Sequence, residues 1–207
     1  STVTVTYTNP QGISFYQPSG GTYYYDGGTD GAGGTSPYTS SAVDNRPPTT
    51  DIIALNSRGQ QTLTFSQAIA NPVFAYVSLN GNGYAFDRDF DILSYGDPSN
   101  GNACGHWGCG TSSKSIVGAE YQLLGTGEPH GVLQFKGTFS SVSWRSLSDE
   151  NWNGFTVGVQ DTAVDFCTAN PTAPGCAPTT GGVPEPASLA LIGLALGALG
   201  WRRRSQA

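Results

Sequence analysis

The chain has 207 residues, including 29 Gly and no Met, and only 12% of its residues are charged. Its formal charge is −6, but three of its nine Lys and Arg residues lie beyond Ala187, so the part before it, with all 15 Asp and Glu residues, carries −9. This composition argues against nucleic acid and anionic membrane surfaces as partners, and it is typical of a secreted β-rich protein rather than a cytosolic enzyme.

Two short strands and a long excursion are predicted at the start of the chain. Apolar residues alternate with threonines in residues 2–8 (TVTVTYT), which indicates a half-buried strand, and a second strand is expected at 13–16. Residues 17–48 are rich in Gly, Ser, Thr and Pro. We interpret them as a surface excursion whose Tyr23–Tyr25 run contacts a sheet, because so long a loop is uncommon in a compact domain.

A dense block of strand signals follows the excursion. Strands are predicted at 51–56, 61–66, 73–79, 84–86 and 90–94. Both faces of residues 73–79 are apolar, so we expect a central strand that is covered on both sides. One face carries Val73, Ala75, Val77 and Leu79, and the other carries Phe74 and Tyr76.

The second half of the chain continues the same pattern. Strands are expected at 115–117, 121–124, 131–136, 138–144 and 155–159. The apolar phase of residues 138–144 shifts between Phe139 and Val142, which indicates a β-bulge near Ser140 and Ser141. About nine to eleven short strands with glycine turns and no convincing internal helix predict an all-β fold, either a β-sandwich or a jelly roll.

Three regions are predicted along the chain. Residues 1–166 form the β-sandwich ectodomain. Residues 167–182 are rich in Pro, Gly and Thr and are expected to be a linker that a disulfide partly restrains. Residues 183–207 form a separate C-terminal segment.

The four cysteines fall in two local pairs, Cys104 with Cys109 and Cys167 with Cys176. An even number of closely spaced cysteines in an exported protein indicates disulfides. Three connectivities are possible, and we favour local pairing. The alternative is a metal site built from Cys104, His106 and Cys109, but it requires a fourth ligand and a reducing compartment, neither of which is evident.

Three aspartates alternate in residues 86–92 (FDRDFDI): Asp87, Asp89 and Asp91. On an extended strand they project from one face at spacings of roughly 6.5–7 Å. Three unscreened carboxylates repel one another, so a cation such as Ca²⁺ would neutralise them and take them as ligands. The alternative is a turn or a solvated strand face on which Arg88 supplies the local counter-charge.

A small loop, CGHWGC, places His106 and Trp107 between two cysteines. An aromatic ring held at the rim of a β-sandwich can stack on the apolar C–H face of a sugar ring. We therefore predict carbohydrate contacts for His106, Trp107 and Trp152, and the Tyr23–Tyr25 run is suited to the same role. Trp144 lies on a predicted strand and is expected in the core instead.

No catalytic residue is predicted. Outside the C-terminal segment the only glutamates are Glu120, Glu128 and Glu150. Two carboxylates that flank a glycosidic bond would make a hydrolase, but nothing in the sequence places two of them on facing strands. His106 and His130 permit a Ser-His-Asp arrangement in number, yet a nucleophile-elbow motif is missing.

The C-terminal segment has three parts in a fixed order: a Val-Pro-Glu-Pro box, the apolar run 187–201 and an arginine cluster. As a helix the run is about 22 Å long at ~1.5 Å per residue, which is short for a bilayer span of ~20 residues. We expect a transmembrane helix that anchors the chain transiently in the inner membrane, with its arginines on the cytoplasmic side. The box and the cluster consist of Val183, Pro184, Glu185, Pro186, Arg202, Arg203 and Arg204.

This segment closely resembles the PEP-CTERM sorting signal of Gram-negative bacteria. The resemblance implies that an exosortase recognises and cuts the signal, and that the protein reaches the cell surface or the exopolysaccharide matrix. From the missing Met we also expect that an N-terminal signal peptide has been removed. The tail is also described as an ice-binding protein C-terminal domain, but the chain shows no flat Thr-repeating strand array, so that description concerns the tail only.

Residues 65–160 are in addition similar to β-sandwich ectodomains of other PEP-CTERM proteins, which supports the fold alone. We therefore predict an exported, non-enzymatic protein with a structural or adhesive role linked to exopolysaccharide. The first alternative is a lectin-like, Ca²⁺-dependent carbohydrate-binding module. The second is a secreted glycan hydrolase.

Overall fold

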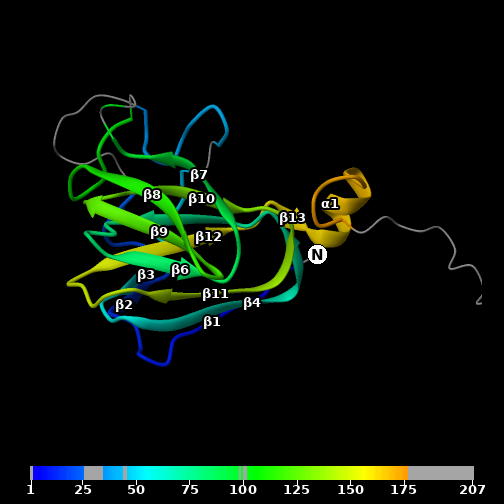
Figure 1. Cartoon of the computed structure of the whole chain (residues 1–207), viewed down its shortest axis with the longest axis horizontal. Coiled ribbons are helices and arrows are strands. Elements are labelled where there is room, and N and C mark those ends of the chain that lie inside the picture. Colours follow the sequence, from blue (N-terminus) through cyan, green and yellow to red (C-terminus); the bar gives the residue numbers. More distant parts are fainter. Residues whose placement is uncertain (1, 26–34, 44–45, 98, 100–101, 177–207) are drawn as a thin grey trace, which may run out of the picture. The chain divides into compact units, whose positions relative to one another are not determined.

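The computed structural model describes residues 2–25, 35–43, 46–97, 99 and 102–176. Within these residues the chain forms strands β1 to β13 and one short helix, arranged as two antiparallel sheets (Figure 1). The predicted all-β fold is therefore confirmed, with more strands than the nine to eleven expected. The sorting residues from Val183 to Arg204 and the apolar run 187–201 lie outside the described residues.

The strand order of each sheet is non-sequential. The seven-stranded sheet runs β1 (Val5–Thr8), β4 (Gly59–Ala70), β11 (Thr138–Ser146), β6 (Gly83–Phe86), β9 (Glu120–Gly127) and β8 (Gly110–Val117), with β13 (Asp161–Thr162) paired to β4. The six-stranded sheet runs β2 (Phe15–Gln17), β3 (Ile52–Leu55), β12 (Asn153–Gly158), β5 (Val73–Val77), β10 (Gly131–Phe135) and β7 (Phe90–Tyr95).

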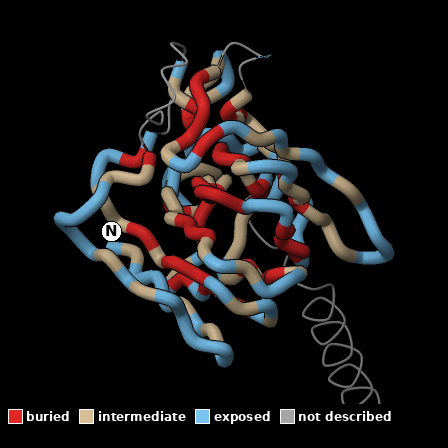
Figure 2. Tube along the Cα trace, turned by 90° about the vertical axis from the view of Figure 1, so that its left-hand side faces the viewer, coloured by how far each residue is buried: buried red, intermediate tan, exposed pale blue. Residues whose placement is uncertain are grey.

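An aromatic core joins the two sheets face to face. Phe74 of β5 meets Phe86 of β6 and Trp144 of β11 edge-on, with ring centroids 5.6 and 5.4 Å apart. It also stacks on Phe155 of the neighbouring strand β12 at 4.7 Å. Because β5 belongs to one sheet while β6 and β11 belong to the other, these rings fix the distance between the sheets. Figure 2 shows the buried residues along the strands inside the fold.

The outer face of the six-stranded sheet is covered by the excursion. Tyr25 and Tyr38 are fully buried there. The Tyr38 hydroxyl donates a 3.2 Å hydrogen bond to the carbonyl of Tyr76, and the Tyr25 hydroxyl donates a 2.8 Å bond to the carbonyl of Asp51. The prediction that β5 is covered on both sides is thus confirmed. Beneath the two tyrosines lie Ala75, Val77 and Val132.

The structure confirms the predicted bulge in β11 and corrects the predicted face of Leu79. The register between β11 and β4 shifts between Phe139 and Ser141, where the bulge was expected. Leu79, however, does not share a face with Val77, because β5 ends at Val77 and Ser78 adopts a positive φ of 54°. This left-handed residue reverses the alternation and turns Leu79 into the core between the sheets.

One short helix was not predicted. Helix α1 (Ala163–Ala169) has Thr162 as its N-cap, whose side-chain oxygen accepts a 3.1 Å hydrogen bond from the backbone N–H of Asp165. None of its residues is fully buried, and only Ala163, Phe166 and Cys167, spaced i, i+3 and i+4, are half-buried. A helix of seven residues is too short for this spacing to stand out in the sequence. Both predicted disulfides are present, and Cys167 of α1 is bonded to Cys176. In the described part of the chain, no helix has the length and apolar character needed to cross a membrane.

We expect Phe74→Ala to lower the free energy of unfolding by about 3–5 kcal/mol, because it leaves a cavity where four rings meet. The measurement is urea or guanidinium unfolding followed by tryptophan fluorescence. Ile116→Ala on β8, where the side chain is 63% exposed, is the control and should change stability by less than about 0.5 kcal/mol. Equal effects of the two substitutions would contradict the assigned core.

Candidate functional site

The strand register places several loops at one end of the two sheets. The end of β5 pairs with the starts of β10 and β12, and the start of β10 also pairs with the end of β7. The disulfide loop 104–109, between β7 and β8, and residues 147–152, between β11 and β12, therefore meet at this end. Both carry residues that the sequence predicted to contact carbohydrate.

The disulfide loop is a miniature hairpin. Gly105 and Gly108 exchange backbone hydrogen bonds of 2.9 and 3.3 Å, which leaves His106 and Trp107 at the tip. Gly108 has a φ of 135°, a conformation that side chains disfavour. The disulfide closes the base of the hairpin and limits how far its tip can move.

A buried histidine supports this hairpin from below. A β-carbon on Gly105 would lie 1.8–2.1 Å from ring atoms of His130, so only glycine permits this approach. Burial, with a smaller effect from nearby His106, lowers the pKa of His130 to about 3. The backbone N–H of Glu128 donates a 3.0 Å hydrogen bond to the carbonyl of Cys109. The hairpin is thus seated on residues 128–130.

Five rings gather at the tip of the hairpin: Phe15, Tyr24, His106, Trp107 and Trp152. We call them the aromatic cluster. Tyr24 is central, with its ring centroid 5.0 Å from Trp152, 5.3 Å from His106 and 6.3 Å from Trp107. Phe15 adds a contact with Trp152 at 6.0 Å. Trp107 is 54% exposed, and the other four rings are partly buried.

The predicted carbohydrate-contact residues are therefore brought together. The ring centroids of His106 and Trp107 lie 4.9 Å apart, and those of Trp107 and Trp152 lie 6.1 Å apart. Trp144 is 1% exposed and belongs to the core, as expected. An exposed ring that other rings hold in place offers an apolar face of fixed orientation.

The sequence did not single out Tyr24 within its tyrosine run. Tyr23 and Tyr25 contact each other at 5.7 Å, and Tyr25 is fully buried. Tyr24 lies between them, where the chain turns, and its ring contacts the aromatic cluster instead. The signal was the run itself, but which of its members faces the site depends on the packing of the excursion.

A polar network lies next to the aromatic cluster. Asn153 donates a 3.0 Å hydrogen bond from its side-chain amide to the Glu150 carboxylate, and the Tyr84 hydroxyl donates to the amide oxygen of Asn153. Burial, with a smaller effect from the carboxylate of Glu128, raises the pKa of Glu150 to about 7. Glu150 precedes Trp152 of the aromatic cluster by two residues, in the loop between β11 and β12.

The other two glutamates have different partners. The Ser78 hydroxyl donates to the Glu128 carboxylate, and the Ser78 N–H donates a 3.4 Å hydrogen bond to His130. Glu120 lies at the opposite end of β9 from Glu128, where Arg145 donates to both of its oxygens at 2.8 and 2.7 Å. Of these three glutamates, Glu128 and Glu150 thus share this end of the fold.

The three alternating aspartates do not lie on one extended strand. Strand β6 ends before Asp87 and β7 begins after Asp89, so the chain turns between them and the expected common face is not formed. Within the described residues, no three His, Cys, Asp or Glu side chains form a group suited to a metal ion. Each carboxylate instead has its own basic partner: Asp87 with Arg88, Asp89 with Lys114, and Asp91 with Lys136.

The alternative metal site at the disulfide loop is excluded. Cys104 and Cys109 are bonded to each other, so neither offers a thiolate. His106 packs against Tyr24 and Trp107 instead.

Glu150→Gln should change how stability depends on pH. Between the ordinary pKa of 4.5 and about 7, the folded protein holds a proton that the unfolded chain has released, so the contribution of Glu150 to stability is largest below 4.5 and is lost as the pH rises to 7. His130 titrates with the opposite sign in an overlapping range. The difference between wild-type and variant urea midpoints across pH 4–8 isolates Glu150, and parallel curves would contradict its raised pKa.

Comparison with known proteins identifies the C-terminal segment. No curated protein and no solved structure matches the chain. A family model described as the PEP-CTERM protein-sorting motif matches residues 182–204, which contain the box, the apolar run and the arginine cluster. The match does not extend into the two-sheet domain. The chain thus carries a PEP-CTERM protein-sorting motif, which implies export and sorting by an exosortase.

Proposed function

We propose that the protein is a non-enzymatic component of the cell surface or extracellular matrix that adheres to polysaccharide through the aromatic cluster. The observation that carries this proposal is the gathering of Tyr24, His106, Trp107 and Trp152 at one end of the fold, with Trp107 54% exposed. The sorting motif supports it, because a protein exported to the surface meets polysaccharide there.

The packing of the cluster suits a sugar ring. Pyranose rings present an apolar C–H face to an aromatic ring and hydroxyl groups at their edges. Tyr24, Trp107 and Trp152 hold one another in place, so little side-chain entropy is lost when a ligand binds. The backbone beneath them is fixed by the disulfide and by the contact between Gly105 and His130.

Charge at this end of the fold favours an uncharged polysaccharide. Glu128 lies close enough to Glu150 to contribute to its raised pKa, and Asp149 precedes Glu150 in the same loop. Carboxylates here repel uronate-rich or sulfated chains. A neutral glycan avoids this repulsion, and its hydroxyls can donate to the same carboxylates.

A second candidate function is glycan hydrolysis. The observation that favours it is Glu150, a carboxyl group whose pKa is raised to about 7 beside a second carboxylate, Glu128. Such a pair resembles a general acid with its partner. Ser78 already donates to Glu128, and Asn153 already donates to Glu150, which favours a structural role for both.

Affinity electrophoresis tests the binding function. We expect dextran, hydroxyethyl cellulose or mannan in the gel to retard the protein, and alginate to retard it less. Trp107→Ala and Trp152→Ala should each remove about 1 kcal/mol of binding free energy, or about fivefold in affinity. Tyr16→Ala is the matched control, since Tyr16 is 60% exposed and lies outside the cluster.

The same experiment separates the alternatives. Equal mobility of wild-type and tryptophan variants in every gel would contradict the proposal. Loss of retardation in EDTA would restore a Ca²⁺-dependent mode, which the basic partners of Asp87, Asp89 and Asp91 do not favour. New reducing ends in the recovered polysaccharide, absent with Glu150→Gln, would establish the hydrolase.

Processing of the sorting motif predicts a defined product. Mass spectrometry of protein recovered from the culture medium should show a C-terminus near residues 184–187. Replacement of Pro184 and Pro186 by Ala should keep the protein in the membrane fraction, because the recognised box is lost. Protein in the medium that still contains Arg202–Arg204 would contradict cleavage.

A further inference from the structure

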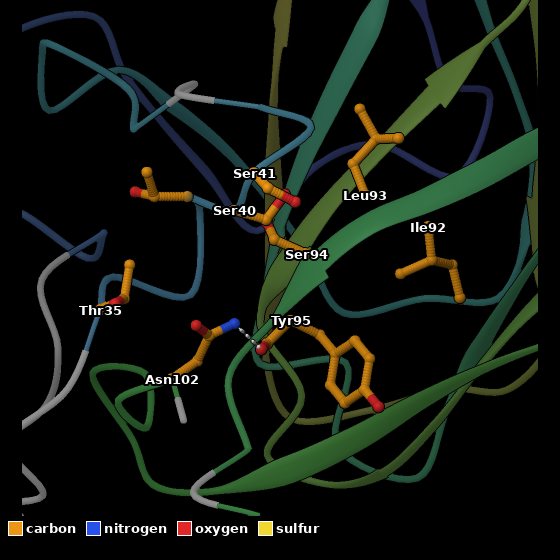
Figure 3. A pocket seen from close by; sticks show the side chains of 9 residues that line it. Thr35, Ser40, Ser41, Ile92, Leu93, Ser94, Tyr95 and Asn102 are labelled. Carbon is orange, nitrogen blue, oxygen red and sulfur yellow. Dashed lines mark hydrogen bonds between the residues drawn. The ribbon is translucent and has the colours of Figure 1, made fainter. Parts of the chain in front are cut away.

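A recess lies beside the edge strand β7, apart from the aromatic cluster. It is a pocket of about 500 Å³ between the excursion, β7 and Asn102 (Figure 3). This volume falls within the range of small-molecule sites, about 300–1,000 Å³. The residues that line it are Thr35, Thr39, Ser40, Ser41, Ile92, Leu93, Ser94, Tyr95 and Asn102.

The walls of this pocket are held together by hydrogen bonds. The Ser94 hydroxyl donates a 2.8 Å bond to the carbonyl of Pro37, which ties β7 to the excursion. The side-chain amide of Asn102 donates a 2.7 Å bond to the carbonyl of Tyr95, as Figure 3 shows. Asn102 also forms a β-bridge with Thr35. The excursion, β7 and Asn102 are thus fixed around the pocket, so it needs little rearrangement to bind a ligand.

The lining chemistry specifies the class of ligand. Hydroxyl groups and one amide come from Thr35, Thr39, Ser41 and Asn102, while Ile92 and Leu93 supply apolar surface. None of the nine lining residues carries a formal charge. A charged ligand would lose its hydration here without gaining a counter-charge. A ligand with many hydroxyls and an apolar face, such as a neutral sugar unit, fits this lining.

The pocket is joined to the aromatic cluster by a short stretch of backbone. Asn102 lines the pocket, and His106 of the cluster follows four residues later. Four residues span at most about 14 Å even when fully extended. The N–H of Ala103 donates a 2.7 Å hydrogen bond to the carbonyl of Thr35, which fixes the near end of this stretch. One glycan chain of several sugar units can therefore reach both places.

We propose that this hydroxyl-lined pocket is a second subsite, which binds one uncharged sugar unit of the same glycan chain that contacts the aromatic cluster. The inference rests on the proposed carbohydrate-binding function and adds to it. It predicts that the protein binds glycan chains more tightly than single sugars or disaccharides. Two linked subsites on one chain raise affinity by making the second contact intramolecular.

Length-dependent binding tests this subsite in the full-length protein. The probes are maltose, cellobiose and mannobiose, and the corresponding hexasaccharides, followed by calorimetry. Ser41→Trp, at an exposed position, fills the pocket, and Ala42→Trp is the matched control on the same loop, since Ala42 does not line it. We expect Ser41→Trp to weaken hexasaccharide binding about fivefold, to leave disaccharide binding unchanged, and Ala42→Trp to affect neither.

A spectroscopic measurement makes the site visible independently of the cluster. In the Trp107→Ala/Trp152→Ala protein, millimolar glucose or mannose should still shift the backbone amide signals of residues 92–95. If the tryptophan variants weaken hexasaccharide binding but Ser41→Trp does not, the subsite is wrong and the cluster stands. If no hexasaccharide binds and no amide of residues 92–95 shifts, both the subsite and the proposed function are overturned.

Discussion

Strand β5 carries the constraint on which the remaining structure depends, because its two faces are apolar in different ways. Phe74 and Tyr76 point into the core between the sheets, while Ala75 and Val77 point outward. The large inner rings set the spacing of the sheets. The small outer residues leave room for Tyr25 and Tyr38, so the excursion is held against the sheet instead of extending into solvent. Burial of these two tyrosines also places Tyr24 at the end of the fold where the other rings gather.

The candidate site is built from backbone devices rather than from a deep cleft. A disulfide, two exchanged hydrogen bonds and the contact between Gly105 and His130 hold two aromatic residues at a hairpin tip. The buried histidine and the partly buried Glu150 oppose stability, since burial disfavours the charged form of each. Strongly perturbed pKa values of this kind cluster at functional sites. Here they lie beneath and beside the aromatic rings.

The sequence was sufficient where the pattern is local. Alternation located the strands, the phase shift at Phe139 located the bulge, and cysteine spacing located both disulfides. It failed where the outcome depends on distant partners. The turn at Asp87–Asp89 resembled an extended strand in its sequence, and helix α1 is too short for a helical period to be recognised. The pocket beside β7 depends on the bond between Ser94 and Pro37, 57 residues apart, which no local pattern encodes.

Sorting and binding are separate properties of separate parts of the chain. The motif at residues 182–204 implies export and sorting, and the two-sheet domain carries the aromatic cluster for which we propose polysaccharide binding. The most direct measurement is the indole N–H spectrum of ¹⁵N-labelled protein during titration with a neutral polysaccharide. The signals of Trp107 and Trp152 should shift together while that of buried Trp144 stays fixed. Unchanged signals of Trp107 and Trp152, with polysaccharide bound, would contradict a binding role for the aromatic cluster.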